Sequence, residues 1–206
     1  MKPDISGVTP PDRELIRILR PGSWKKAELR LVETSAGPCV EKDYRGLSPL
    51  LRFYAAVILR REKQAYKALK DVPCIPRCHS CGGGLLVIEY VEGMAISRLM
   101  GRPRGPAAFR SLERCVQAMH DHGVYHLDLR KRDNLLVTEE DQVWLVDFAS
   151  ATRIRPGTIK SWLLRGLLAF FDGYAVLKWK SVLDPDRMSS SDWSRVKWLN
   201  RIRFRT

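Results

Sequence analysis

Two neighbouring stretches, HLDLRKRDNLLV at 126–137 and VWLVDFA at 143–149, decide the fold that this sequence predicts. Each contains a short apolar run, 135–137 and 143–146, of the kind that forms a buried strand. The acidic residues 139–141 between the two runs predict the turn of a hairpin. Asp147 directly follows the second strand, where burying a carboxylate is costly unless a cation or hydrogen bonds satisfy it.

Three oxygen-bearing side chains flank this hairpin. Asp128 and Asn134 lie on the loop that precedes it, and Asp147 lies where it ends. Two carboxylates and an amide that converge in this way form a hard, oxygen-rich ligand set, which suits Mg²⁺ completed by water and phosphate oxygens. The alternative is a basic loop before an ordinary hairpin.

The two stretches resemble the catalytic loop, H-R-D-L-x-x-x-N, and the D-F-G motif of the protein-kinase-like superfamily. The resemblance implies an α+β, bilobal fold with a small antiparallel-sheet N-lobe and a truncated, mainly helical C-lobe. It also implies transfer of the γ-phosphoryl group of ATP to an acceptor hydroxyl. Carried over by position, Asp128 is the catalytic base, Asn134 and Asp147 hold Mg²⁺ or Mn²⁺, Arg130 contacts the γ-phosphate, and His126 is structural.

Three departures from the family pattern indicate an atypical kinase. Asn134 lies one position later than the pattern allows, and Asp133 occupies the expected place. The choice between these two as metal ligand stays open, although the Leu-Leu-Val continuation favours Asn134. Leu127 replaces the arginine that pairs with a phosphorylated activation segment, and Ala149 replaces the glycine of D-F-G.

The N-terminal half provides a second set of candidates. Turn signals divide residues 17–46 into three expected strands, and apolar spacing predicts a helix over 50–70. Lys42 ends the third strand, and Glu62 is the helix's lone acid on its apolar face, so the two are expected to pair and to hold phosphates. The alternative is that both are surface charges.

Further cofactor contacts follow from the same resemblance. Gly22, with Lys25 or Lys26, is expected to cover the phosphates, although the full glycine-rich motif is absent. The segment from Glu89 to Val91 resembles the linker whose backbone binds adenine. We therefore expect an N-lobe over 1–92 and a C-lobe over 93–206, with helices at 106–122 and through most of 157–206.

Charge and composition bear on the acceptor. The formal net charge is +13, which favours anionic partners. The chain is similar to compact bacterial lipopolysaccharide core kinases, which phosphorylate Kdo or heptose, and to RIO-type atypical protein kinases. The first hypothesis is a kinase acting on a core sugar or similar glycolipid. The alternative is a RIO-like protein serine/threonine kinase, and the third is a pseudokinase or RNA-binding module.

The C-terminal quarter is basic and rich in tryptophan. Residues 151–206 hold 12 Lys or Arg and 4 Asp or Glu, and Trp193 and Trp198 alternate with cations from about 192 onward. A helix there would suit packing on the lobe, an anionic membrane or, in last place, RNA. The apolar run 162–171 is interrupted by Arg165 and too short to span a bilayer. We expect a cytoplasmic protein, with peripheral contact at the inner face of a membrane.

Cys74, Cys78 and Cys81 form a competing motif. Their spacing is similar to that of the three cluster ligands in radical S-adenosylmethionine enzymes, and thiolates this close also suit zinc. That chemistry normally needs a large α/β barrel, for which too few residues follow. Whether these cysteines bind metal is left open here.

Overall fold

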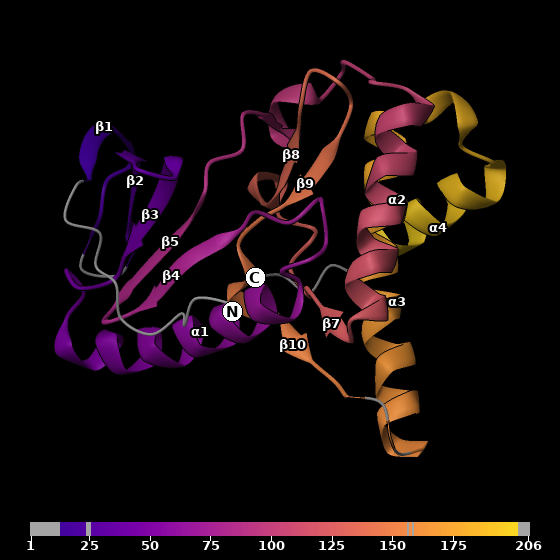
Figure 1. Cartoon of the computed structure of the whole chain (residues 1–206). Coiled ribbons are helices and arrows are strands. Elements are labelled where there is room, and N and C mark those ends of the chain that lie inside the picture. Colours follow the sequence, from indigo (N-terminus) through magenta and orange to yellow (C-terminus); the bar gives the residue numbers. More distant parts are fainter. Residues whose placement is uncertain (1–12, 24–25, 156, 158, 202–206) are drawn as a thin grey trace. The chain divides into compact units, whose positions relative to one another are not determined.

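The computed structural model describes residues 13–23, 26–155, 157 and 159–201. Its contacts divide the chain into two compact units, which are Met1–Val91 with Phe148–Ser150, and Glu92–Asp147 with Ala151–Thr206. Figure 1 shows the elements of each unit. The chain therefore returns to the first unit for three residues, directly after Asp147.

The first unit contains a five-stranded sheet of order β1-β2-β3-β5-β4, in which every pairing is antiparallel. The strands are β1 (Glu14–Arg20), β2 (Glu28–Thr34), β3 (Gly37–Asp43), β4 (Cys78–Gly82) and β5 (Leu85–Glu89). The first three are those expected within 17–46. Buried Val32, Cys39 and Val87 form a small cluster on β2, β3 and β5, which joins these strands into one layer.

Helix α1 (Pro49–Ala68) is the long helix of the first unit. Proline in its first turn lacks only an N–H that has no partner inside a helix, so the helix can begin there. Its buried residues recur at helical spacing and are Ala55, Leu59, Glu62, Ala65 and Tyr66. Phe148, from the returning segment, packs edge-to-face on Tyr66 with ring centroids 5.1 Å apart. The α1 stripe thus fixes one end of the returning segment.

The second unit combines two α-helices in contact, a third helix and two small sheets. The helices are α2 (Pro106–Asp121), α3 (Ile159–Leu183) and α4 (Ser190–Arg201). One sheet has the order β6-β8-β9, from Met94–Ala95, Leu135–Val137 and Val143–Leu145, and the other pairs β7 (Val124–Tyr125) with β10 (Thr152–Arg153). The β8–β9 hairpin is the one that the sequence predicts.

The C-terminal region is helical, as expected, but it is interrupted. A 3-10 turn at Pro185–Arg187 separates α3 from α4, so α4 begins at Ser190, two residues before the expected start. Leu112, Met119 and Trp179 are buried where α2 and α3 pack together. Within the described ranges, no helix combines the length and apolarity that crossing a membrane requires.

Gly123 provides a test of the second unit's fold. It has φ +69° after the end of α2, and a Cβ there would lie 2.5 Å from the backbone oxygen of Ile154. Gly101 has φ +77° but open space around it. We expect Gly123→Ala to lower the free energy of unfolding by about 3 kcal/mol, from backbone strain and a clash, and Gly101→Ala by about 1 kcal/mol, from strain alone. Equal shifts in the thermal midpoint would contradict this packing.

Candidate active site

The first unit contains a buried ion pair between two of the candidate residues. The Lys42 Nζ lies 3.0 Å from Glu62 Oε1, and the two side chains are 12% and 0% exposed. The Tyr44 hydroxyl donates to the other Glu62 oxygen at 3.4 Å. A fully buried carboxylate needs such partners. The pair expected from the sequence is therefore present, joining β3 to α1.

The remaining candidates in the first unit are Gly22 and the segment from Glu89 to Val91. Gly22 is exposed and precedes a tight turn, in which Ser23 and Lys26 exchange backbone hydrogen bonds at 2.9 and 3.2 Å. Lys25 lies outside the described residues. At the other end of β5, the Glu89 N–H donates to Arg77 and the Tyr90 N–H to Pro38. Val91 is therefore the stronger candidate for a backbone hydrogen bond to adenine, because the N–H of Glu89 already donates to the Arg77 carbonyl.

The loop 126–134 of the second unit is held by one buried carboxylate. Asp172 of α3 accepts hydrogen bonds from the backbone N–H groups of His126 and Leu127, each at 2.9 Å. It also lies 3.0 Å from Nε2 of His120 on α2. Leu127 has φ +63°, a strained conformation for a leucine. The two hydrogen bonds stabilise that conformation.

Asp172 is absent from the set of residues that the sequence analysis selects. It lies 38 residues beyond the end of the loop, since 172 − 134 = 38, and belongs to no recognised motif. One signal was available, because Asp172 is the only acid within the long apolar helix that became α3. A carboxylate in such a position implies a buried partner.

His126 fixes the loop to the end of the hairpin. Its Nε2 lies 3.1 Å from the Val146 carbonyl oxygen, and the ring is fully buried. Burial lowers the pKa of His126, so the neutral ring is favoured. A neutral ring has one N–H, and Nε2–H donating to Val146 accounts for this contact. The structural role implied for His126 agrees with this geometry.

Asn134, rather than Asp133, lies with Asp128. The Asn134 amide nitrogen donates to the Asp128 carbonyl at 3.0 Å and to its carboxylate at 3.3 Å, and Asn134 is 1% exposed. Asp133 is exposed and contacts the Ser97 hydroxyl at 3.3 Å. Asp133 therefore points to solvent, and Asn134 is the member of the pair that contacts Asp128.

Asp147 has the unusual backbone expected of a functional position. Its φ is +66°, although it is not a glycine. The Lys131 Nζ lies 3.3 Å from its carboxylate, a contact that no sequence signal predicted. Ala149, which replaces the family's glycine, lies in the 3-10 turn Phe148–Ser150 and has no positive φ, so a methyl group is tolerated there.

Arg130 packs against a residue of α3. Its guanidinium lies over the Tyr174 ring, 5.2 Å from the centroid, and its carbonyl accepts from Lys178. Burial, with the nearby charge of Arg130, lowers the pKa of Lys178 to about 8. Within the described residues, Lys131 rather than Arg130 supplies the cation that contacts Asp147.

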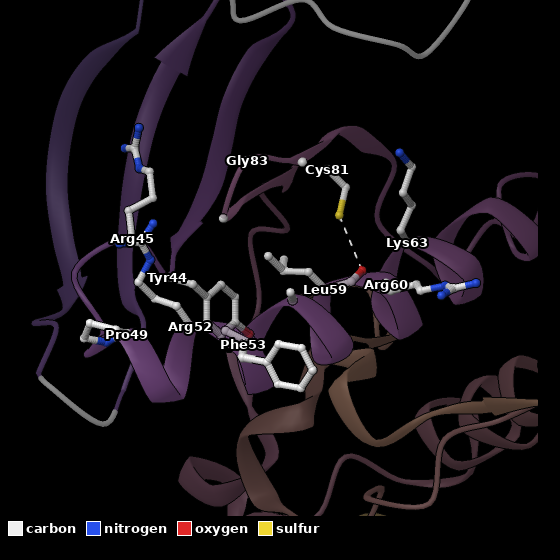
Figure 2. Close-up of a pocket in the computed structure, with 14 residues that line it drawn as sticks. Tyr44, Arg45, Pro49, Arg52, Phe53, Leu59, Arg60, Lys63, Cys81 and Gly83 are labelled. Carbon is white, nitrogen blue, oxygen red and sulfur yellow. Dashed lines mark hydrogen bonds between the residues drawn. The ribbon is translucent and has the colours of Figure 1, made fainter.

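The cysteine motif is not organised as a metal site in the described residues, where no cluster of three His, Cys, Asp or Glu could hold an ion. Burial raises the pKa of Cys78 to about 12 and that of Cys81 to about 11, which disfavours the thiolates that metals need. The Cys81 thiol instead donates to the Leu59 carbonyl at 3.5 Å (Figure 2).

Cys81 lines a pocket of about 620 Å³ in the first unit, shown in Figure 2. Apolar residues of α1, the β3–α1 loop and the glycine turn 82–84 form much of its wall. Its charged lining residues are all cations, namely Arg45, Arg52, Arg60 and Lys63. Tyr44 belongs both to this wall and to the contacts of Glu62, so the pocket adjoins the ion pair.

Comparison with known proteins gives the family. A family model described as the RIO domain matches residues 45–175, which include Glu62, Asp128, Asn134 and Asp147. The chain belongs to the RIO domain family. Its fold is similar to that of a Rio2 kinase from Chaetomium thermophilum, solved as an ADP/Mg²⁺-phosphoaspartate complex, with a TM-score of 0.61 and 15% identity. That match covers 89% of this chain and 61% of the other.

Curated relatives of this RIO domain chain are longer kinases. The chain is 33% identical over 100 residues to CBL-interacting protein kinase 1 of Oryza sativa subsp. japonica, and 28% identical over 78 residues to sperm motility kinase 2B of Mus musculus. These matches cover 44% and 35% of this chain but only 21% and 16% of the relatives. The protein-kinase-like superfamily and fold expected from the sequence are confirmed.

Asp172 gives a test of the loop anchor. Replacing it with alanine leaves two backbone N–H groups without their acceptor, so we expect a loss of about 3 kcal/mol in unfolding free energy and faster amide exchange at residues 126 and 127. Asp172→Asn keeps one acceptor oxygen and should have a smaller effect. Asp186→Ala, at an exposed acid in the same unit, should change neither quantity. Unchanged exchange in Asp172→Ala would exclude the anchor role.

Proposed function

We propose that the chain is an ATP-dependent phosphotransferase of the RIO type that phosphorylates serine or threonine hydroxyls of proteins. The observation that supports this most strongly is the grouping of Asp128, Asn134 and Asp147 around one anchored loop. Membership in the RIO domain family favours this reading over the glycolipid hypothesis, since nothing in the comparisons supports a sugar acceptor. Retention of this grouping also argues against a pseudokinase.

The donor set fits a magnesium ion. The Asn134 amide oxygen and the carboxylate of Asp147 are hard oxygen donors, and both flank the same hairpin. Mg²⁺, when bound, would neutralise phosphate charge that develops during transfer. Lys131, 3.3 Å from Asp147, adds a positive charge beside the same carboxylate. Mn²⁺ has similar ligand preferences and should substitute.

The remaining residues have distinct roles in this proposal. The Asp128 carboxylate accepts the proton of the acceptor hydroxyl while that oxygen forms a bond to the γ-phosphorus of ATP. The bond from the γ-phosphorus to the bridging oxygen breaks, and ADP leaves with the electron pair. Lys42, oriented by Glu62, binds the α- and β-phosphates. The backbone of Val91 binds adenine, and Gly22 lies at the turn that covers the phosphates.

The direct test is transfer of labelled phosphate from γ-³³P-ATP. With Mg²⁺, we expect label on Ser or Thr of the protein itself or of a generic protein substrate, and none on core sugars or lipid extracts. Label on a sugar alone would overturn the acceptor class while leaving the phosphotransferase activity in place. ATP binding without transfer to any acceptor would overturn the activity itself.

Matched variants test the residue roles. Asp128→Asn and Asp147→Asn should each lower kcat by about 100-fold or more, because they remove the base and a metal ligand. Asp133→Asn changes an exposed neighbour in the same loop and should stay within about twofold of the parent. Circular dichroism checks that all three fold. Near-normal turnover in either of the first two variants would contradict the assignment.

A further inference from the structure

The first half of α3 exposes an unusual amount of apolar surface. Six large side chains between positions 162 and 171 are 41% to 72% exposed, and they are Trp162, Leu163, Leu164, Leu167, Phe170 and Phe171. Figure 1 shows this part of α3 extending past the end of α2 within the second unit. Monomeric soluble proteins rarely leave contiguous patches above a few hundred Å² uncovered, so this surface calls for a partner.

Four of these six exposed residues lie on one side of the helix, while Trp162 and Leu164 lie about 100° to either side of Leu163. Leu163, Leu167, Phe170 and Phe171 follow the spacing i, i+4, i+7 and i+8 that defines a single helical face. We call these four residues, together with Trp162 and Leu164, the α3 apolar face. Phe170 and Phe171 also contact each other edge-to-face, with centroids 6.1 Å apart. The face is thus continuous over about three turns.

The opposite side of α3 is already used inside the second unit. Arg165 donates to the Tyr125 hydroxyl at 2.9 Å, Asp172 holds the loop 126–134, and the Trp179 indole donates to the Leu129 carbonyl at 2.6 Å. These contacts fix the rotation of the helix about its axis. The α3 apolar face cannot turn inward without breaking them, so it remains directed away from the unit's core.

The charged residues in this part of the chain and just before it have one sign. Residues 148–171 contain Arg153, Arg155, Lys160 and Arg165 and no acidic residue. Arg153 and Arg155 are exposed just before the helix. An aromatic and leucine face bordered by cations matches the outer layer of an anionic membrane, where apolar residues enter the acyl boundary and cations meet lipid phosphates.

A second copy of the chain fits this surface less well. In a two-fold dimer the same patch meets itself, and a parallel pairing of the helices would place Arg153 and Arg155 of both copies together. No acid in 148–171 is available to offset that repulsion. Like charges placed together across an interface disfavour association. The charge pattern therefore favours lipid over self-association.

We propose that the α3 apolar face binds the surface of anionic lipid bilayers, with the helix lying along the membrane plane. This assignment concerns α3 and does not depend on the proposed phosphotransferase activity. It also differs from the expectation for the tryptophans of α4, since Trp193 and Trp198 lie on a separate helix. Because the inner side of α3 holds the loop 126–134, the loop would be carried at the membrane.

Co-sedimentation with sucrose-loaded vesicles tests this proposal in the full chain. We expect binding to phosphatidylcholine vesicles that contain about 30 mol% phosphatidylglycerol, and binding at least about tenfold weaker to pure phosphatidylcholine. Raising the salt concentration should weaken the binding without abolishing it, because the apolar contribution is not screened. Absence of binding to the anionic vesicles would overturn the proposal.

Two double variants assign the binding to a helix. Leu167→Asp with Phe170→Asp should lower the vesicle partition coefficient about tenfold or more, since each change puts a carboxylate into the acyl boundary. Trp193→Ser with Trp198→Ser on α4 should stay within about twofold. Circular dichroism confirms folding of each. Unchanged binding in the α3 variant, or equal loss in the α4 variant, would overturn the assignment.

Light scattering after gel filtration tests whether a second copy of the chain, rather than lipid, covers the α3 apolar face. A monomer that binds anionic vesicles supports the lipid assignment. A dimer that becomes monomeric in the α3 variant would show that a second copy covers the face, and this would overturn the proposal.

Discussion

The carboxylate of Asp172 accepts hydrogen bonds from two consecutive backbone N–H groups, those of His126 and Leu127, at the start of the loop that carries Asp128 and Asn134. The loop needs such an anchor because Leu127 has a left-handed backbone conformation. His126 then connects the loop to Val146, next to Asp147, and the Asn134 carbonyl accepts from the N–H of Val146. One buried acid on α3 thus anchors the loop whose further contacts reach Val146, next to Asp147.

In the first unit, two contacts depend on helix α1. Helix α1 contributes Glu62, which pairs with Lys42, and Tyr66, on which Phe148 packs. Asp147 and Phe148 are neighbours in the chain, yet they belong to different units. Asp147 flanks the hairpin and Phe148 packs on α1, so one peptide bond links these two positions. The presence of Asp147 and Phe148 side by side is therefore explained by the structure itself, independently of the family resemblance.

Local patterns predicted much of this structure. The strand runs, the α1 stripe and the β8–β9 hairpin are encoded in neighbouring residues, and so is the inward position of Glu62. The sequence did not reveal Asp172, the Lys131–Asp147 contact or the position of Arg130 on Tyr174. Each of these depends on tertiary packing that no short motif records. The run 162–171 was evaluated only for its length, whereas its exposure depends on which side of α3 faces the core.

The family places this chain among proteins whose fold binds nucleotide, and the chain's own residues indicate how it would do so. The cation of Lys42, the loop anchored by Asp172 and the oxygen donors that flank the hairpin all favour phosphoryl transfer with a divalent metal. The basic, apolar surface of α3 is the basis of the proposed contact with anionic lipid, which the family does not imply. Both conclusions rest on the same helix, which holds the loop on one side and exposes its apolar face on the other.

In the proposed function, Asn134 and Asp147 hold a magnesium ion and Lys42 binds nucleotide phosphates. The most direct measurement is a crystal structure of the chain with Mg²⁺ and a non-hydrolysable ATP analogue. It should show oxygens of Asn134 and Asp147 within about 2.1 Å of a magnesium ion, and Lys42 Nζ against the α- and β-phosphates. A nucleotide bound away from these residues, or a metal held without Asn134 and Asp147, would contradict the account.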